Sequence, residues 1–404
     1  MKKFGLLFVA VTTVALTAAI NMESNACPFC SAPSLTLTEQ VSQSDAVVLV
    51  QWLSGKKPTD QEPGFTIYEV MDITRDAKNP IPKGKKIQLS RYRSGTKGDL
   101  FILMGTEGKT IDWGSPVEVT DDGYKYMAEA PSPEMETASR LEYFINYLEH
   151  SDQLVSNDAY AEFANAPYED ISMISDKLPR TKIRDWVKNA DTPGTRLGLY
   201  GLLLGLSGDE ADAKVMESRI TEKSSDFRLG IDGIMSGYLL LKGDKGLDTI
   251  DRTKLMVGQL KDKEGNPVEI PFSETYAAMQ ALRFMWTYGN DRIPKERLRK
   301  SMRHLLDRPE LADLVIADLA RWKDWSIQDR LLKIYDDEAY NVRAIKRAVI
   351  RYFYYCSIDV PKDEHGEPIA EKKPAHAISA EKHLKVLEIK DPKMYRDAKR
   401  YLLD

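Results

Sequence analysis

The chain is poor in the residues from which catalytic and metal-binding sites are most often built. Its 404 residues include three cysteines and five histidines, and the histidines at positions 150, 304, 365, 376 and 383 do not have the spacing of metal ligands. Three cysteines cannot form a disulfide framework, and scattered histidines leave few ways to build a metal cage. Neither a Gly-x-Ser-x-Gly nor a His-Glu-x-x-His pattern occurs. We therefore expect no cofactor, no metal site and no catalytic residues, which favours a protein that is not an enzyme.

An excess of positive charge is also lacking. The chain has 57 Lys and Arg against 62 Asp and Glu, a net charge of −5, which gives no electrostatic reason to expect binding to nucleic acid or to an anionic lipid surface. A hydrophobic fraction of 42% with 29% charged residues is typical of a soluble globular protein. The length favours two or three domains.

Only the N-terminus carries a long apolar run. A pair of lysines precedes an apolar stretch over residues 4–20, and small residues follow at Ser24 and Ala26, which is the order found in a secretory signal. We expect residues 1–26 to be a cleaved signal peptide, leaving a secreted or periplasmic protein that begins at Cys27 and has no stable membrane span. Two alternatives stay open, an uncleaved membrane anchor and a lipid anchor on Cys27. Bacterial lipoprotein signals carry a large aliphatic residue three positions before the cysteine. Here that position is Ser24, which makes the lipid anchor the weaker alternative.

Residues 27–131 are predicted to form a small β domain. Five β-rich runs separated by turn residues cover Ala46–Trp52, Phe65–Ile73, Lys86–Arg91, Asp99–Met104 and Tyr124–Ala128. Residues 47–50 are apolar in succession, as in a strand buried on both sides, and Gly105–Thr110 is predicted to be a hairpin turn. Because five strands protect their edges best by curling, we expect a five-stranded barrel of the oligonucleotide/oligosaccharide-binding (OB) type.

After residue 131 the apolar period becomes helical. Helical runs are predicted at Pro193–Leu206, Asp209–Ile220, Phe227–Leu241, Ser273–Tyr288 and Pro294–Leu306. Helix pairs that recur every 30 to 47 residues or so are typical of an α-solenoid. We therefore expect a multidomain α+β protein, in which the OB-like β-barrel is followed by an α-solenoid over residues 132–356 and by a C-terminal loop and helical extension over residues 357–404.

One segment of the helical half has a more specific pattern. Residues 336–345 read Asp, Asp, Glu, Ala, Tyr, Asn, Val, Arg, Ala, Ile, which resembles the inter-helix turn and second helix of a HEAT repeat. The similarity extends over about residues 150–356. The resemblance implies HEAT-like helix pairs, in which Arg343 holds the turn by bonding the carboxylate of Asp336 or Asp337.

A second pattern covers the front half. Cys27-Pro28-Phe29-Cys30 is followed by the run Ser44–Val50 and by the strands Phe65–Ile73 and Asp99–Met104. This order resembles the netrin/metalloproteinase-inhibitor (TIMP-like) type of OB barrel, in which the mature N-terminal cysteine sits on the zinc of a protease. The whole arrangement is also similar to secreted bacterial proteins that pair such a leader with helical repeats.

The cysteines leave several interpretations open. Cys27 and Cys30 could form a local structural disulfide or a thiol redox site, and Cys27 could contact a metal supplied by a partner. Cys356 follows apolar residues on one helical face and is expected to be an inert core thiol.

These observations favour a non-enzymatic, extracytoplasmic protein-interaction module in which the barrel and the solenoid each offer a binding surface to a protein partner. The first alternative is a protease-inhibitor-like or metal-contacting protein that acts through Cys27. The second is a thiol redox protein that uses Cys27 and Cys30.

Overall fold

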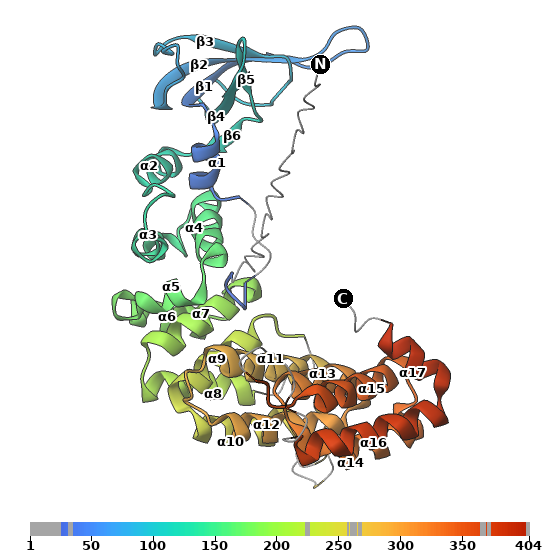
Figure 1. The fold of residues 1–404 in the computed structure, drawn as a ribbon. Helices are drawn as coiled ribbons and strands as arrows, with labels where there is room; N and C mark the ends of the chain where they lie inside the picture. Colours follow the sequence, from blue (N-terminus) through green and yellow to red (C-terminus); the bar gives the residue numbers. More distant parts are fainter. Residues whose placement is uncertain are drawn as a thin grey trace, which may run out of the picture.

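The computed structural model describes residues 26–30, 35–222, 227–256, 269–363 and 373–400, together with residues 258, 265 and 369. Over these residues a six-stranded antiparallel sheet is followed by a long array of helices, which confirms the α+β class (Figure 1). Apart from Ala26, the expected signal peptide lies outside the described residues.

The sheet is open. Its strands are β1 (Ala46–Lys56), β2 (Phe65–Arg75), β3 (Lys86–Leu89), β4 (Leu100–Glu107), β5 (Ile111–Trp113) and β6 (Val117–Val119). They follow the order β3-β2-β1-β4-β5, and β6 pairs with β4 beside β5. The two outer strands β3 and β5 do not pair with each other in this order, so the expected closed barrel is not confirmed. Strands β4 and β5 form the predicted hairpin around Gly108.

The predicted strand Tyr124–Ala128 is wrong, because these residues lie in helix α2 (Asp121–Glu129). Thr120 caps this helix by accepting a hydrogen bond from the backbone N–H of Gly123 at 2.9 Å. Asp121 and Asp122 lie in the first turn, where their negative charges stabilise the helix by interacting with the positive end of its dipole. The Asp-Asp-Gly sequence therefore starts a helix instead of making a hairpin turn.

Strand β1 is buried on both sides, as its apolar run predicted. Val47 and Leu49 belong to the large core that the sheet shares with the helices. Val48 and Val50 lie on the opposite face of the sheet, in a smaller core made mostly by residues of the strands. The large core also contains Leu141 and continues through the helices, so the hydrophobic packing is continuous across residue 131.

Helices α7 to α17 (residues 194–399) form two rows. Short helix α1 (Leu37–Gln43) precedes the sheet and was not expected from the sequence. The remaining helices are α3 (Thr137–Phe144), α4 (Gln153–Asn165), α5 (Tyr168–Met173), α6 (Arg180–Lys188), α7 (Gly194–Ser207), α8 (Glu210–Thr221), α9 (Ile231–Lys242), α10 (Asp244–Ile250), α11 (Phe272–Tyr288), α12 (Lys295–His304), α13 (Ala312–Arg321), α14 (Gln328–Asp336), α15 (Arg343–Ile358), α16 (Ala375–Lys390) and α17 (Pro392–Lys399). Helices α7, α9 and α11 pack in series, as do α13, α15 and α17, while α8, α10, α12, α14 and α16 pack beside them (Figure 1).

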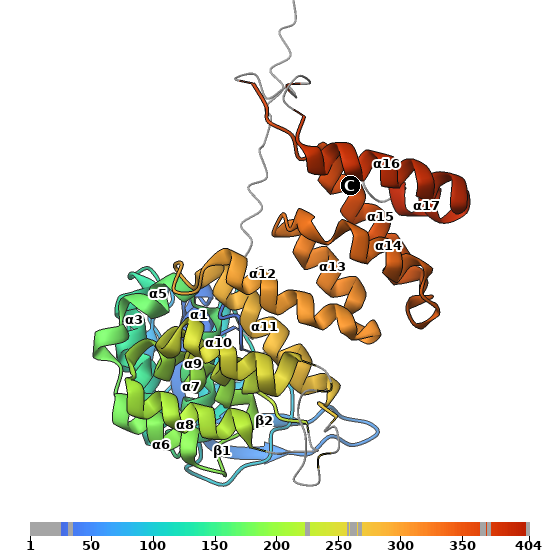
Figure 2. The same cartoon turned by 90° about the horizontal axis from the view of Figure 1, so that it is seen from below.

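Most of the predicted helical runs are confirmed within a few residues. Asp209 caps α8 through the backbone N–H groups of Ala211 and Asp212. Helix α9 begins at Ile231, four residues later than predicted, because Gly230 before it adopts a left-handed conformation with φ of +77°. Seen from below, α13 to α17 project away from the block that contains α5 to α12 (Figure 2).

Helices α7 and α9 meet through glycines. A methyl group added at Gly237 would lie 2.0 Å from the carbonyl oxygen of Gly201, and one added at Gly205 would lie 2.3 Å from the Cα of Gly237. These distances allow no side chain, so the two backbones are in direct contact.

Candidate functional site

The predicted cysteine pair packs against the helices, with Cys27 buried and Cys30 partly buried. Cys27 and Cys30 are joined by a disulfide. The backbone N–H of Cys27 donates to the carbonyl of Ala164 at 3.1 Å, and the ring of Phe29 lies 5.0 Å from that of Phe284. The segment of residues 26–30, here called the N-terminal loop, therefore joins α4 to α11.

This placement weighs against chemistry at Cys27. Cys27 is 5% exposed, and its sulfur is bonded to that of Cys30. While this disulfide is in place, Cys27 has no thiolate that could attack a substrate or bind a metal. Cys30 is partly buried, and a disulfide is also the oxidised form of a thiol redox pair, so the redox hypothesis stays a prediction. An inhibitor of the metalloproteinase-inhibitor type requires an accessible N-terminus, whereas here the backbone of Cys27 is turned toward Ala164.

The turn before α15 is held by other contacts than expected. Asp336 forms an ion pair with Lys390, and Asp337 accepts a hydrogen bond from the backbone N–H of Ala339 at 2.9 Å. Arg343 pairs with Asp397 of α17 at 3.0 Å, and its side chain is 66% exposed. The expectation that Arg343 bonds Asp336 or Asp337 is therefore wrong, because a lysine and the local backbone occupy those carboxylates and α17 offers another.

Cys356 is a core thiol, as predicted. It is free and fully buried in α15, where burial raises its pKa to about 12. Tyr352 and Phe353 beside it are also fully buried, whereas Tyr355 is 46% exposed. The aromatic cluster thus divides between the core and the surface.

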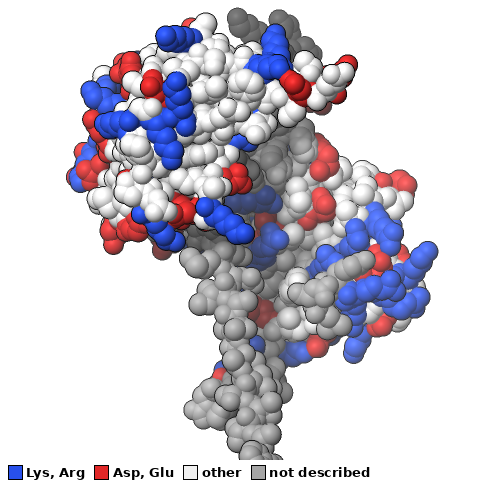
Figure 3. Space-filling view, turned by 90° about the horizontal axis from the view of Figure 1, so that it is seen from above, with Lys and Arg blue, Asp and Glu red and all other residues white. Residues whose placement is uncertain are grey.

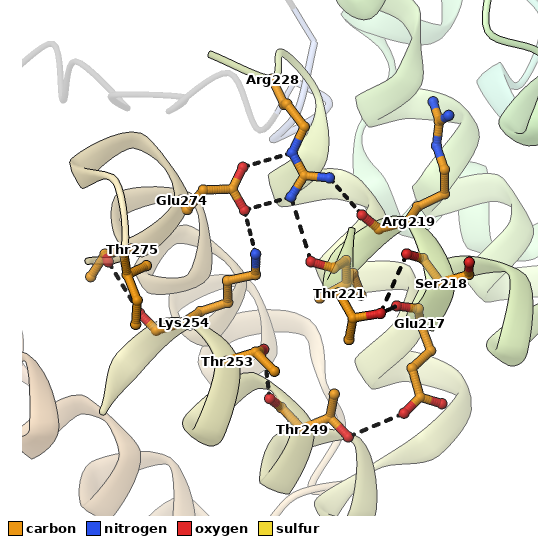
Figure 4. A network of polar contacts seen from close by, with 12 residues as sticks. Glu217, Ser218, Arg219, Thr221, Arg228, Thr249, Thr253, Lys254, Glu274 and Thr275 are labelled. Carbon is orange, nitrogen blue, oxygen red and sulfur yellow. Dashed lines mark hydrogen bonds and ion pairs between the residues drawn. The ribbon is translucent and has the colours of Figure 1, made fainter. Parts of the chain in front are cut away.

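Two buried polar clusters serve the fold. In the first, Glu274 of α11 accepts hydrogen bonds from Arg228 at 2.6 and 2.8 Å and from Lys254 at 2.6 Å (Figure 4). Burial lowers the pKa of Lys254, and its contact with Glu274 opposes this effect. Both cations face one carboxylate inside the protein, so this cluster leaves no group for a ligand.

The second polar cluster attaches α1 to the helices below the sheet. Asp158 of α4 accepts hydrogen bonds from the backbone N–H of Leu37 at 2.6 Å and from the hydroxyl of Tyr126 at 2.8 Å. Arg140 pairs with Glu162 at 2.5 Å one turn further along α4. Burial raises the pKa of Asp158 to about 6, although both hydrogen bonds act in the opposite direction.

The best candidate for a binding site is a groove between α13 and α15, here called the α13–α15 groove. Its volume is about 1020 Å³ and most of its lining is apolar. One complete face of α15 lines it, with Ala344, Arg347, Ala348, Arg351, Tyr352, Tyr355 and Ile358, and α13 contributes Asp313, Leu314, Ala317, Ala320 and Arg321. Leu314, Tyr355 and Ile358 are exposed large hydrophobic side chains. Grooves of this size and character are typical binding sites.

Positive charge surrounds the apolar surface of the groove. The cationic lining residues are Arg321, Lys323, Arg347, Arg351 and Lys362, whereas the acidic ones are Asp313 and Asp359. Helix α15 contains four Lys and Arg residues and neither Asp nor Glu. Figure 3 shows Lys and Arg side chains gathered over this C-terminal end of the helical array.

The acidic residue at the end of the groove already has partners. Asp359 accepts hydrogen bonds from Lys323 at 2.7 Å and from the indole N–H of Trp325 at 2.6 Å. Burial raises the pKa of Asp359, but these two bonds outweigh burial and hold it below its usual range. Arg347, by contrast, makes no hydrogen bond or ion pair with any residue in the described ranges.

Sequence reasoning did not find this groove, although two signals for it were present. The aromatic run at residues 352–355 was too long for a single buried face, and the segment 343–358 carries positive charge alone. Neither signal identifies α13 as the opposite wall, because that depends on how separate helices pack.

No protein-family model, no curated protein and no solved structure matches this chain. Among the residues that the structure describes, no three His, Cys, Asp or Glu side chains gather as metal ligands would. The helices in the same ranges include none with the length and apolar character needed to cross a bilayer.

Proposed function

We propose that the protein is a non-enzymatic interaction module that binds a segment of a protein partner in the α13–α15 groove. The observation that carries this proposal is the face of α15 that lines the groove among the described residues, which is largely apolar and rimmed by Arg and Lys side chains. Contiguous exposed apolar surface with a polar rim marks interaction sites in otherwise soluble proteins.

The architecture supports the same proposal. Helices α13, α15 and α17 pack in series with α14 and α16 beside them, and this is the arrangement by which HEAT-like solenoids present extended binding surfaces. We also propose that the sheet is an open relative of the OB barrel and offers a second surface.

We propose an extracytoplasmic location, secreted or periplasmic. The disulfide between Cys27 and Cys30 supports it, because such bonds persist in oxidising compartments. The signal-like pattern of residues 1–26 supports the same location.

A site-specific crosslinking experiment tests the function. A photo-crosslinking amino acid is placed at Leu314 or Tyr355 in the groove, and as a control at Val386, which is 56% exposed on α16. We expect both groove positions to capture one polypeptide that the Val386 position does not. That polypeptide, once identified and purified, should bind the wild-type protein and lose affinity for Leu314→Asp but not for Val386→Asp.

The proposal fails if the purified polypeptide binds both aspartate variants as it binds the wild type. It also fails if the groove positions and Val386 capture the same polypeptides to the same extent.

A further inference from the structure

Resting on the proposed function, we infer that the segment bound in the α13–α15 groove is an acidic amphipathic helix of the partner protein. Its apolar side chains would cover Leu314, Tyr355 and Ile358, and its carboxylates would reach Arg347 and the other cations of the rim. Three properties of the groove lead to this inference.

The first property is the length of the exposed surface. The lining residues of α15 run from Ala344 to Ile358, and they recur at intervals of three and four residues along one face. The fourteen residue-to-residue steps between them, at 1.5 Å each, correspond to a length of about 21 Å. A partner helix of about four turns matches this length and would pack its own i, i+3 and i+4 positions along the groove.

The second property is the shape of the walls. Four of the lining residues are alanines, two on each wall, at positions 317, 320, 344 and 348. Small side chains let a helix approach closely, and the large exposed side chains of the lining supply apolar contact area.

The third property is charge. Five cations and two carboxylates line the groove, and one of the carboxylates, Asp359, is already bonded to Lys323 and Trp325. Arg347 lies near the N-terminal end of the α15 face with no hydrogen bond or ion pair to another described residue. An arginine in that position can form a charge-assisted bond with a carboxylate of the partner. A basic partner would meet repulsion at the same place.

The test uses designed peptides and the chain from residue 27 to its end. The probe is a fluorescein-labelled 18-residue peptide with Leu on one helical face and Glu on the other. The first comparison peptide has the same composition but a shuffled order, and the second has Lys in place of Glu. Binding is measured by fluorescence polarisation, and the thermal midpoint of each protein variant is measured to show that it is folded.

We expect the acidic amphipathic peptide to bind at least about tenfold more tightly than either comparison peptide, and raising the salt from about 0.05 to 0.5 M to weaken it about tenfold. Arg347→Glu should weaken this binding by about tenfold or more and should improve binding of the Lys peptide. Lys385→Glu makes the same change of charge on the exposed part of α16, outside the groove, and should leave both affinities unchanged. Leu314→Ala, at a position that is 37% exposed, should weaken the acidic peptide without loss of folding.

Several results would overturn the inference. One is equal affinity for the acidic and the shuffled peptide, and another is an equal effect of Arg347→Glu and Lys385→Glu. Binding to vesicles rich in phosphatidylglycerol that Arg347→Glu abolishes, without binding of the peptide, would show a lipid ligand instead. If a crosslinked partner depends on Leu314 but has no acidic helix, this inference fails and the proposed function stands. If neither partner nor peptide depends on Leu314, both fail.

Discussion

The glycine contact between α7 and α9 predicts a large effect for a small substitution, Gly237→Ala. The new methyl group would lie 2.0 Å from the carbonyl oxygen of Gly201 and 2.8 Å from its carbonyl carbon. Both atoms belong to the backbone of α7, so no side-chain rotation can relieve the overlap. The helices would have to separate by about 1 Å or more, which opens the packing on either side of the contact.

Two effects of opposite sign determine the magnitude. Alanine is a better helix former than glycine by about 1 kcal/mol in a helix interior. Overpacking a well-packed contact costs about 3 kcal/mol at the upper end of its usual range, and a contact between two backbones belongs there. We expect Gly237→Ala to lower the free energy of unfolding by about 2 kcal/mol.

Urea denaturation followed by circular dichroism at 222 nm measures this change. Gly108→Ala is the matched control, because the nearest atom to its new methyl group would be the carbonyl oxygen of Thr110 at 3.5 Å, an ordinary contact. The control should stay within about 0.5 kcal/mol of the wild type. A Gly237→Ala protein that is more stable than the wild type would show that helix propensity alone acts, and the direct contact of α7 with α9 would then be refuted.

Three further predictions concern charged groups. Burial raises the pKa of Asp158 to about 6, so the stability gained from its protonated form is fully present below about pH 4 and is lost as the pH rises through about 6. From about pH 4 to 7 the wild type should therefore lose about 3 kcal/mol of unfolding free energy relative to Asp158→Asn. Parallel pH profiles of the two proteins would contradict this. Glu274→Gln should lower the unfolding free energy by about 3 kcal/mol, because it leaves the buried ammonium of Lys254 without its carboxylate; a loss below about 1 kcal/mol in urea denaturation would refute it. Arg343→Ala should cost less than about 1 kcal/mol, because its pair with Asp397 is largely exposed, and a thermal midpoint lowered as much as that of Glu274→Gln would contradict the assignment.

The sequence predicted the helices that carry strong local signals. Helix α8 has a capping aspartate at Asp209 and a regular apolar period, and α11 is long and apolar enough to be recognised from its own residues. These features depend on neighbours within a turn or two of helix, which a single sequence contains.

One error was local, whereas the other two features that were missed depend on contacts between residues far apart in the sequence. The segment 124–128 contains two tyrosines and suits either a strand or a helix, and the cap at Thr120 decides between them. The expected partner of Arg343 was wrong because the real one, Asp397, lies 54 positions further along the chain. The α13–α15 groove likewise depends on the contact between two separate helices, which local patterns do not determine.

The position of the N-terminal loop limits the order in which the protein can fold. Phe29 packs on Phe284 of α11, so the first described residues complete their contacts with a helix that is made much later. Contacts between distant positions carry a loop-closure cost before they return packing energy. During synthesis the N-terminus is made first, so residues 26–30 lack their native contacts with α11 until that helix has formed. The bond between Cys27 and Cys30 spans only four residues and can close before that, so the loop can acquire its shape early and join the core last.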